Sequence, residues 1–253
     1  MVLRRLAVVA LLLCMLVGMS GSAWASRPRF GVFLAGEFSS ETIYKAMAMG
    51  LTIMWRERLN VTLGLDRNDF VVDWLDIHSA RYAQLNPRLG FQAGGVSVAL
   101  ARLDGQGNPT AVVLRRGPFD LRVDTMLDNP ELGQLMDAGD EAVGRLARAL
   151  GRPMPLAGVY VLNPKDVDQA EARRFRLRRF GAVVYHVTSL SSAFLGGLQE
   201  GDQIVQVNRR PVRGVKDYVN ALRRVNAVGK TMRVAFWRAG QVHRAAFKIQ
   251  AYP

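Results

Sequence analysis

Cysteine and histidine are scarce in this chain of 253 residues, and both scarcities narrow its chemistry. The single cysteine, Cys14, lies in an apolar N-terminal run, so the rest of the chain has no disulfide and no thiol nucleophile. Between residues 26 and 154 the only histidine is His78, and neither His-x-x-x-His nor Gly-x-Ser-x-Gly occurs. These absences predict a protein without metal or cofactor, and they leave little from which to build a catalytic site.

Long apolar runs are confined to the N-terminus. Arg4 and Arg5 precede the apolar run Leu6–Val17, and Ala23-Trp24-Ala25 has the small-x-small form of a cleavage site. This order is typical of a bacterial secretory signal peptide, and it predicts cleavage after Ala25 and a periplasmic or secreted protein. The alternative is an uncleaved anchor, because Leu6–Ala25 is long enough to span a bilayer and would then hold the protein at a membrane.

Acidic residues are few in the second half of the chain. Residues 26–154 carry 15 Lys/Arg and 15 Asp/Glu, whereas residues 155–253 carry 17 Lys/Arg and only 6 Asp/Glu. A field of this sign favours anionic partners such as acidic peptides, lipid headgroups or nucleic acid. The export signal argues against nucleic acid, so an acidic protein or peptide ligand is the expected partner.

The sequence of residues 26–152 predicts an α+β domain, but it does not indicate which fold or family this domain has. Strands are expected at Arg29–Leu34 and in a hairpin over residues 92–116, and helices are expected from Ser39-Ser40 to Leu59 and from Pro130 to Leu150. Residues 60–65 and 70–75 fit helix and strand equally. Four acids recur every three or four residues and would share a helix face that could hold a cation, although a solvated face is the simpler interpretation: Asp66, Asp69, Asp73 and Asp76.

Residues 155–253 predict a second domain of short strands with two helices. A strand is expected at Leu156–Leu162, a short helix at Asp166–Arg174 and an amphipathic helix at Val215–Arg224. A closing hairpin is expected from Met232 to Ile249 around Ala239-Gly240. In the stretch Phe180–Val212, Gly197 and Gly201 suit tight turns and Asp202 can accept backbone N–H groups.

This order resembles a bacterial PDZ domain of the kind found behind HtrA-like serine proteases, over residues 155–250. The most diagnostic part is Ser191-Ser192-Ala193 followed by Gly197–Asp202 and Val207-Asn208. The departures are Ser192 where proline is usual, Gly196 where alanine is usual and Arg209 where glycine is usual. The resemblance implies a small, partly open β-barrel capped by two helices.

The resemblance also implies how such a domain would bind. In PDZ domains an extended peptide adds a strand beside a helix, with its C-terminal carboxylate held by backbone amides. The carboxylate loop is expected at Arg179-Phe180-Gly181-Ala182, and the pairing edge strand at Ala182–Val187, which includes Val183, Val184 and Tyr185. The opposite wall is expected to comprise four residues of the following helix, each of which could equally be a core residue: Val215, Val219, Leu222 and Arg223.

The function expected from these observations is an exported, non-catalytic protein that binds an extended or C-terminal peptide by strand addition. A degenerate or active HtrA-like serine protease is an alternative, but His78, Asp104 and Ser97 stand in no recognisable context and a Gly-x-Ser-Gly-Gly nucleophile is absent. An envelope or secretion-system scaffold is a further alternative. The sequence does not indicate an oligomeric state.

Overall fold

The structure of the protein is a computed structural model. It describes residues 29–38, 42–66, 68–121, 127, 129–189 and 191–252. The expected signal peptide and the expected helix caps Ser39 and Ser40 lie outside the described residues.

The N-terminal part, residues 29–152, is built on a four-stranded sheet in the order β2-β1-β3-β4, in which β1 and β2 run parallel and the other pairs run antiparallel. Its strands are β1 (Arg29–Gly36), β2 (Phe70–Asp76), β3 (Val96–Leu103) and β4 (Pro109–Phe119). Its helices are α2 (Thr42–Glu57), the π-helical turn η1 (Arg58–Thr62), α3 (Ala80–Leu89) and α4 (Pro130–Ala149). Of the undecided residues, 60–62 belong to η1 and 63–65 to the loop after it, whereas residues 70–75 belong to strand β2.

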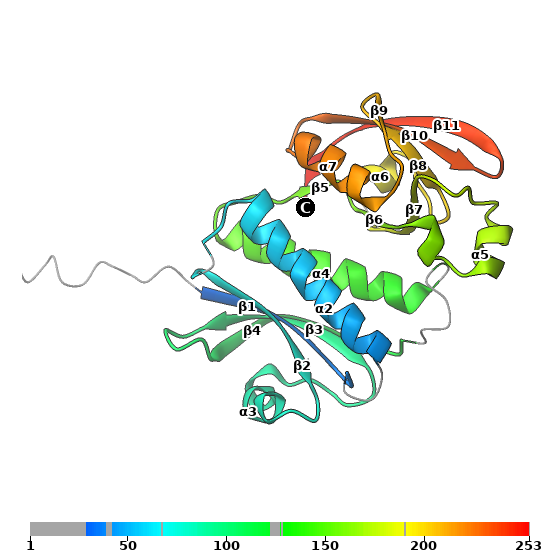
Figure 1. The fold of residues 1–253 in the computed structure, drawn as a ribbon. Coiled ribbons are helices and arrows are strands. Elements are labelled where there is room, and N and C mark those ends of the chain that lie inside the picture. Colours follow the sequence, from blue (N-terminus) through cyan, green and yellow to red (C-terminus); the bar gives the residue numbers. More distant parts are fainter. Residues whose placement is uncertain are drawn as a thin grey trace, which may run out of the picture.

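Both faces of this sheet are covered, because its central strand β1 is apolar on both sides. Val32 and Leu34 belong to a core shared with α2 and α4, whereas Phe33 and Ala35 belong to a second core with α3. The strand alternation thus separates two cores, as the two-residue side-chain period requires. Figure 1 shows α2 and α4 side by side above the sheet and α3 below it.

Helix α4 is one continuous helix, as the sequence predicts from Pro130 to Leu150, although it contains three glycines. Asn129 caps it by accepting a hydrogen bond from the Leu132 amide, and Pro130 occupies its first turn, where a missing N–H costs nothing. A Cβ atom at Gly139 would overlap the Trp55 ring of α2. The glycine is therefore a packing requirement, and it lets α2 and α4 approach closely.

The C-terminal part, residues 155–252, is a strongly curved sheet in the order β11-β10-β8-β7-β6, with β9 beside β8 and a separate pair β12-β5. Its strands are β5 (Pro155–Leu156), β6 (Val159–Leu162), β7 (Ala182–Val187), β8 (Gln203–Val207), β9 (Arg210–Pro211), β10 (Thr231–Arg238), β11 (Gln241–Lys248) and β12 (Gln250–Ala251). Its helical segments are η2 (Pro164–Asp166), α5 (Gln169–Arg174), α6 (Ser192–Leu195) and α7 (Val215–Val225). The α+β class expected from the sequence is confirmed.

The Gly197–Asp202 stretch forms the turn that the sequence predicts. Asp202 is buried; it accepts a hydrogen bond from the Gln199 amide at 2.9 Å and two from the Arg238 guanidinium at 2.6 and 2.7 Å. Gly201 has φ 81°, and its α-carbon lies against the Phe175 ring. The turn therefore ties β8 to the end of β10 and anchors the basic segment that precedes β7.

One of the apolar clusters spans both parts, and α2 and α4 lie between the N-terminal sheet and the C-terminal strands (Figure 1). Leu156 and Tyr160 of the C-terminal part belong to the same buried cluster as Trp55, Leu135 and Leu146. No helix in the described part of the chain combines the length and apolarity needed to cross a bilayer.

Candidate functional site: a groove between β6 and α7

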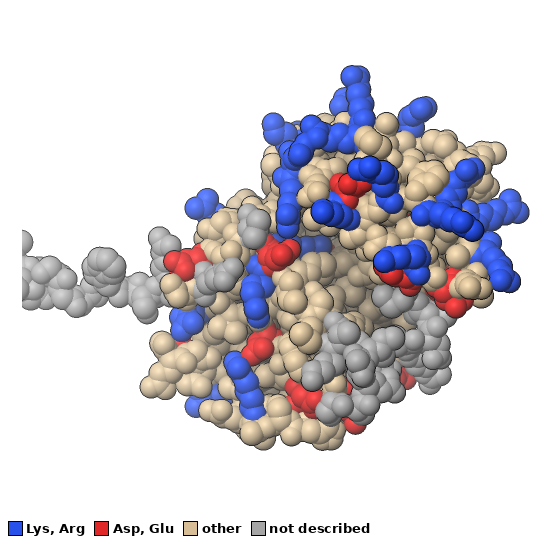
Figure 2. Space-filling model, viewed as in Figure 1, with Lys and Arg blue, Asp and Glu red and all other residues tan. Residues whose placement is uncertain are grey.

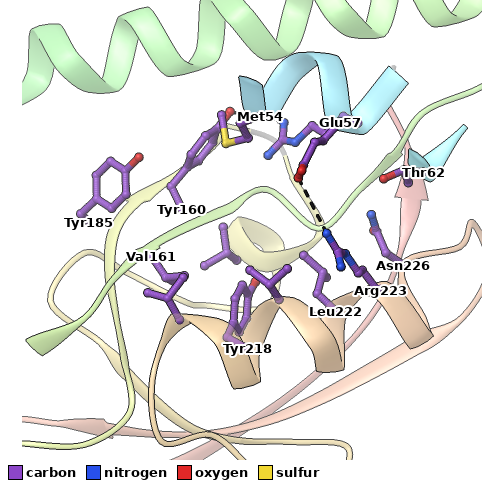
Figure 3. Close-up of a pocket in the computed structure, with 14 residues that line it drawn as sticks. Met54, Glu57, Thr62, Tyr160, Val161, Tyr185, Tyr218, Leu222, Arg223 and Asn226 are labelled. Carbon is purple, nitrogen blue, oxygen red and sulfur yellow. Dashed lines mark hydrogen bonds and ion pairs between the residues drawn. The ribbon is translucent and has the colours of Figure 1, made fainter. Parts of the chain in front are cut away.

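A groove runs between strand β6 and helix α7, and helix α2 closes its third side. Strand β6 pairs with β7 on one side only, and no described strand pairs with its other edge. Facing that edge, α7 presents one side to the groove. Figure 3 shows α7 below and α2 above, with the lining side chains between them.

The groove has a volume of about 400 Å³, and most of its wall is apolar. Met54 of α2 and Val161 of β6 face Leu222 of α7 across it (Figure 3). The remaining lining residues come from α2, η1, β6, β7 and α7 and from the residue that follows α7: Glu57, Arg58, Thr62, Val159, Tyr160, Tyr185, Val215, Tyr218, Val219, Arg223 and Asn226. A concave apolar site with a few polar groups has the character of a ligand site.

Two polar atoms at the groove have no hydrogen-bond partner among the described residues. They are the Tyr218 hydroxyl and the Asn226 Oδ1 atom, and both are buried. Tyr218 is 1% exposed, and burial raises its pKa well above the usual value, so the hydroxyl is neutral and can donate or accept. Because a buried polar atom without a partner costs free energy, these two atoms mark positions where a ligand could supply the missing hydrogen bonds.

Charged side chains lie at the end of the groove nearest the N-terminal part. Glu57 of α2 and Arg223 of α7 form an ion pair across the opening at 3.8 Å, and both side chains are more than half exposed. Such an exposed pair adds little stability and can open at small cost. A ligand entering the groove could therefore displace this ion pair at little cost.

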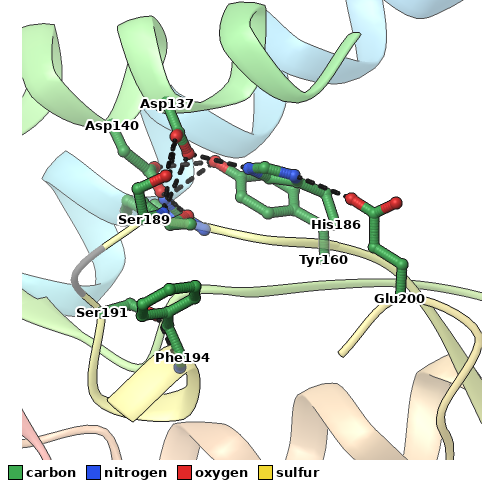
Figure 4. A network of polar contacts seen from close by, with 10 residues as sticks. Asp137, Asp140, Tyr160, His186, Ser189, Ser191, Phe194 and Glu200 are labelled. Carbon is green, nitrogen blue, oxygen red and sulfur yellow. Dashed lines mark hydrogen bonds and ion pairs between the residues drawn. The ribbon is translucent and has the colours of Figure 1, made fainter. Parts of the chain in front are cut away.

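Strand β6 is held against the N-terminal part by hydrogen bonds to Asp140 of α4. The buried Asp140 carboxylate accepts hydrogen bonds from the Tyr160 hydroxyl at 2.7 Å, the Thr188 hydroxyl at 2.6 Å and the Arg58 guanidinium. Burial alone would lower the pKa of Arg58, but Asp140 and Tyr160 outweigh it and keep the guanidinium charged. Tyr160 thus joins two features, because its backbone is the groove edge and its hydroxyl is held by α4 (Figure 4).

A second contact between the parts is centred on His186 of β7. Its Nε2 atom lies 2.8 Å from Asp137 of α4, and its Nδ1 atom lies 3.3 Å from Glu200 (Figure 4). Burial alone would lower the pKa of His186, but the hydrogen bonds to Asp137 and Glu200 raise that pKa to about 9. His186 is therefore charged at neutral pH, and it links α4 to the sheet as a cation between two carboxylates.

The expected pairing strand was wrong. Ala182–Val187 is β7, an interior strand with β6 on one side and β8 on the other, so its backbone has no free edge for an added strand. Val183 and Val184 are fully buried, while Tyr185 lies partly buried at the groove. The edge that faces α7 belongs to Val159–Leu162, which the sequence predicted as a strand without assigning it this role.

The expected carboxylate loop is also misplaced. The Gly181 amide donates to the Arg213 carbonyl at 3.0 Å, and Gln203 donates to the Phe180 carbonyl, so this loop is closed by its own chain. Arg179 and Phe180 are exposed, Ala182 is buried in β7, and none of the four residues lines the groove. By contrast, the four residues expected from the helix all lie at the groove: Val215, Val219, Leu222 and Arg223.

Ser97 and Asp104, two of the three residues weighed for a serine-protease triad, are not brought together. Ser97 is buried near the start of β3 and Asp104 follows its end, so roughly 3.3 Å per strand residue separates them by about 23 Å. Asp104 instead accepts hydrogen bonds from the Gln106 and Asn108 amides. The alternative of a cation-binding helix face is wrong as well, because Asp73 lies in β2 and pairs with Arg81. Within the described ranges no cluster of three potential metal ligands occurs.

Positive charge gathers on the C-terminal part. Figure 2 shows Lys and Arg side chains over the upper part of the view, where the C-terminal strands lie, with few Asp or Glu among them. This matches the excess of Lys and Arg in residues 155–253. A ligand approaching the groove from this side therefore meets a positive field.

No family model and no curated protein sequence matches this chain. Among solved structures, the PDZ domain of HtrA3 bound to a phage-derived ligand is 18% identical, with a TM-score of 0.31, and the match covers 39% of this chain and 86% of that one. The HtrA-type protease AlgW with a decapeptide is also 18% identical, with a TM-score of 0.32 over 66% of this chain and 52% of that one. An aminopeptidase N family protein from Idiomarina loihiensis is 16% identical, with a TM-score of 0.29 over 40% of this chain.

The chain thus spans 15% of that aminopeptidase and about half of AlgW. PDZ and HtrA-type structures are among the matches, as the sequence resemblance leads one to expect. At these identities and TM-scores the likeness concerns the shape of part of the chain and carries no conclusion about activity.

Proposed function

We propose that the protein binds an extended segment or C-terminus of another polypeptide in the groove between β6 and α7. The observation that carries this proposal is the unpaired edge of β6 beside an apolar groove. An extended peptide added to that edge would satisfy backbone hydrogen bonds on one side. Its alternate side chains would enter the groove between α7 and α2.

The chemistry of the groove sets the class of peptide. Apolar side chains suit the surface of Met54, Val161 and Leu222, and a polar group at the same depth would pair the Tyr218 hydroxyl. The positive field of the C-terminal part favours acidic residues in the portion of the peptide that stays outside the groove. The ligand class is therefore an acidic polypeptide with an apolar anchor residue.

The test is a titration of the purified chain with a library of fluorescent peptides, read by anisotropy. Leu222→Arg would place a charge in the apolar groove, and we expect it to weaken the best peptide at least about tenfold, the equivalent of one lost anchor contact. Val242→Arg is the matched control, because Val242 is a 54% exposed apolar residue on β11 that lies outside the groove. Failure of every peptide to bind, or equal binding by both variants, would contradict the proposal.

The same experiment can ask whether α2 belongs to the site. Met54→Arg changes the wall contributed by the N-terminal part and leaves α7 intact. Selective loss of peptides with large anchor residues would assign α2 a role in choosing the ligand. Unchanged affinities would restrict the site to β6 and α7.

Export and the absence of catalysis belong to the same proposal. The signal-like segment before Ala25 supports a periplasmic or secreted protein, and N-terminal sequencing of the exported chain checks it, since cleavage leaves Ser26 first. The separation of Ser97 from Asp104 supports binding without hydrolysis. Casein hydrolysis that is lost in Ser97→Ala would refute that part.

A further inference from the structure

A second hollow lies on the outer face of the C-terminal sheet, where three arginines surround an alanine floor. It has a volume of about 330 Å³ and shares no lining residue with the groove. Arg209 comes from the turn between β8 and β9, Arg233 from β10 and Arg244 from β11. Ala235 and Ala246 lie between them and leave the space above the sheet open.

The register of the sheet explains why these side chains share one face. Ala235 is paired with Arg244, and Arg233 is paired with Ala246, in the antiparallel β10-β11 ladder. Directly paired residues lie on the same face, and so do residues two apart along one strand. The alternation of alanine and arginine across the two strands therefore produces a small floor beside two guanidinium groups.

The arginines of the hollow have no acidic partner in the described part of the chain. The C-terminal part holds only six acids, and each has a hydrogen-bond partner away from the hollow: Asp166, Asp168, Glu171, Glu200, Asp202 and Asp217. No described hydrogen bond or ion pair involves the guanidinium of Arg209, Arg233 or Arg244. All three arginines are exposed, so water screens their mutual repulsion. No acidic side chain among the described residues compensates their charge, however, and an anion in the hollow would be attracted to all three.

The backbone gives an independent indication at Arg209. Asn208 and Arg209 form the two-residue loop between β8 and β9, with φ 45° and 67°. In such hairpin loops Asn-Gly is strongly preferred, because both central residues take positive φ. An arginine in the second position stores backbone strain that a glycine would avoid. Strain of this kind indicates that the arginine side chain has a use.

We propose that this hollow binds a phosphate group. A phosphate offers several acceptor oxygens and up to two charges, which suit three guanidinium groups better than the two oxygens and single charge of a carboxylate. The phosphate belongs to a free phosphomonoester or to the headgroup of an anionic lipid, and the test separates these sources. This site is independent of the peptide groove.

Two probes are titrated against the purified chain at low salt. They are glycerol phosphate, measured by calorimetry, and vesicles containing phosphatidic acid, whose headgroup is also a phosphomonoester, measured by co-sedimentation. Arg233→Gln and Arg244→Gln are each expected to lower affinity at least about tenfold, because each removes a charge-assisted hydrogen bond. Arg179→Gln is the control of equal charge change, since Arg179 is exposed and lies outside the hollow. Neutral vesicles control for apolar adsorption.

Binding to vesicles alone assigns the site to a lipid headgroup, and binding to glycerol phosphate assigns it to a free phosphomonoester. Either result supports the proposal when the hollow variants lose affinity and the control does not. Equal losses in Arg179→Gln and Arg244→Gln would reduce the effect to net charge and overturn the site. Absence of binding by both probes would overturn it as well.

Arg209→Gly separates ligand binding from folding. Glycine adopts the positive φ of this position without strain, so the variant is expected to melt at a temperature equal to or higher than that of the parent. We expect it to lose at least about tenfold in affinity for the phosphate probe all the same. A variant that is more stable and binds undiminished would show that Arg209 does not serve the hollow.

Discussion

Replacing Asp140 by alanine should destabilise the protein more than any surface charge change. Its carboxylate is fully buried and accepts hydrogen bonds from three groups, of which two, Tyr160 and Thr188, belong to the C-terminal part. Arg58 retains 21% side-chain exposure, so its guanidinium can turn to water when the carboxylate is gone. The Tyr160 and Thr188 hydroxyls cannot turn to water, because both residues are buried.

The magnitude follows from those two hydroxyls and the lost charge pair. A buried hydroxyl left without a partner costs about 1–3 kcal/mol. Loss of one partner of a buried ion pair costs about 3–5 kcal/mol in proteins, and the exposure of Arg58 places this case toward the lower end. Two such hydroxyls cost at least about 2 kcal/mol and the broken ion pair costs about 3 kcal/mol, so we expect Asp140→Ala to lower the free energy of unfolding by about 5 kcal/mol.

Urea denaturation followed by tryptophan fluorescence measures this loss, with Glu141→Ala as the control on the same helix. Glu141 pairs with Arg116 and Arg145, whose side chains are about half exposed, so its removal should cost no more than about 1 kcal/mol. Thr188→Val keeps the shape and removes one hydroxyl, and in the Asp140→Ala background it should cost little more. A loss below about 1 kcal/mol for Asp140→Ala, or one equal to that of Glu141→Ala, would refute the reasoning.

Three further predictions concern the interface, the helices and the groove. The pKa of His186 is raised from its unfolded value of 6.5 to about 9, so its contribution to stability is fully present below about pH 6.5 and is lost as the pH rises through 9. Denaturation between pH 6 and 10 should show this decline in the free energy of unfolding, and His186→Gln should remove the decline. Gly139→Ala should lower the free energy of unfolding by about 1–3 kcal/mol, because the added methyl group overlaps Trp55. Gly50→Ala should raise it by about 0.5–1 kcal/mol, because a Cβ atom at Gly50 has no neighbouring atom within 4 Å. Equal effects of the two variants in thermal melts would contradict this. Tyr218→Phe should preserve or raise the melting temperature yet weaken peptide binding, and unchanged affinity would show that no ligand uses the hydroxyl.

Local pattern was enough to predict most elements of this fold. The closing hairpin, the long helix from Pro130 and the turn around Asp202 all follow from alternation, capping and glycine placement, which act within a few residues. The helix of residues 215–225 was placed correctly too, and all four wall residues lie at the groove. These features depend on neighbours in sequence, so the sequence displays them directly.

The order of strands depends on distant pairing, and there the prediction failed. Alternation shows that two strands exist but does not show which of them forms the edge. One signal was available: Ala182, Val183 and Val184 are consecutive apolar residues, which is typical of a strand buried on both faces inside a sheet. Their complete burial in β7 agrees with that pattern and leaves the edge to β6.

The share of the N-terminal part in the site had no local signal at all. Arg58 and Asp140 are 82 residues apart, and they meet where α2 and α4 pack closely around Gly139. Their contact then holds the Tyr160 hydroxyl, while the Tyr160 backbone belongs to the edge that faces α7. A ligand bound along β6 and the packing of the two parts therefore act on the same residue. If the proposed ligand and the packing are coupled through Tyr160, linkage requires the coupling to be reciprocal, so the ligand would stabilise the packing by as much as the packing stabilises ligand binding.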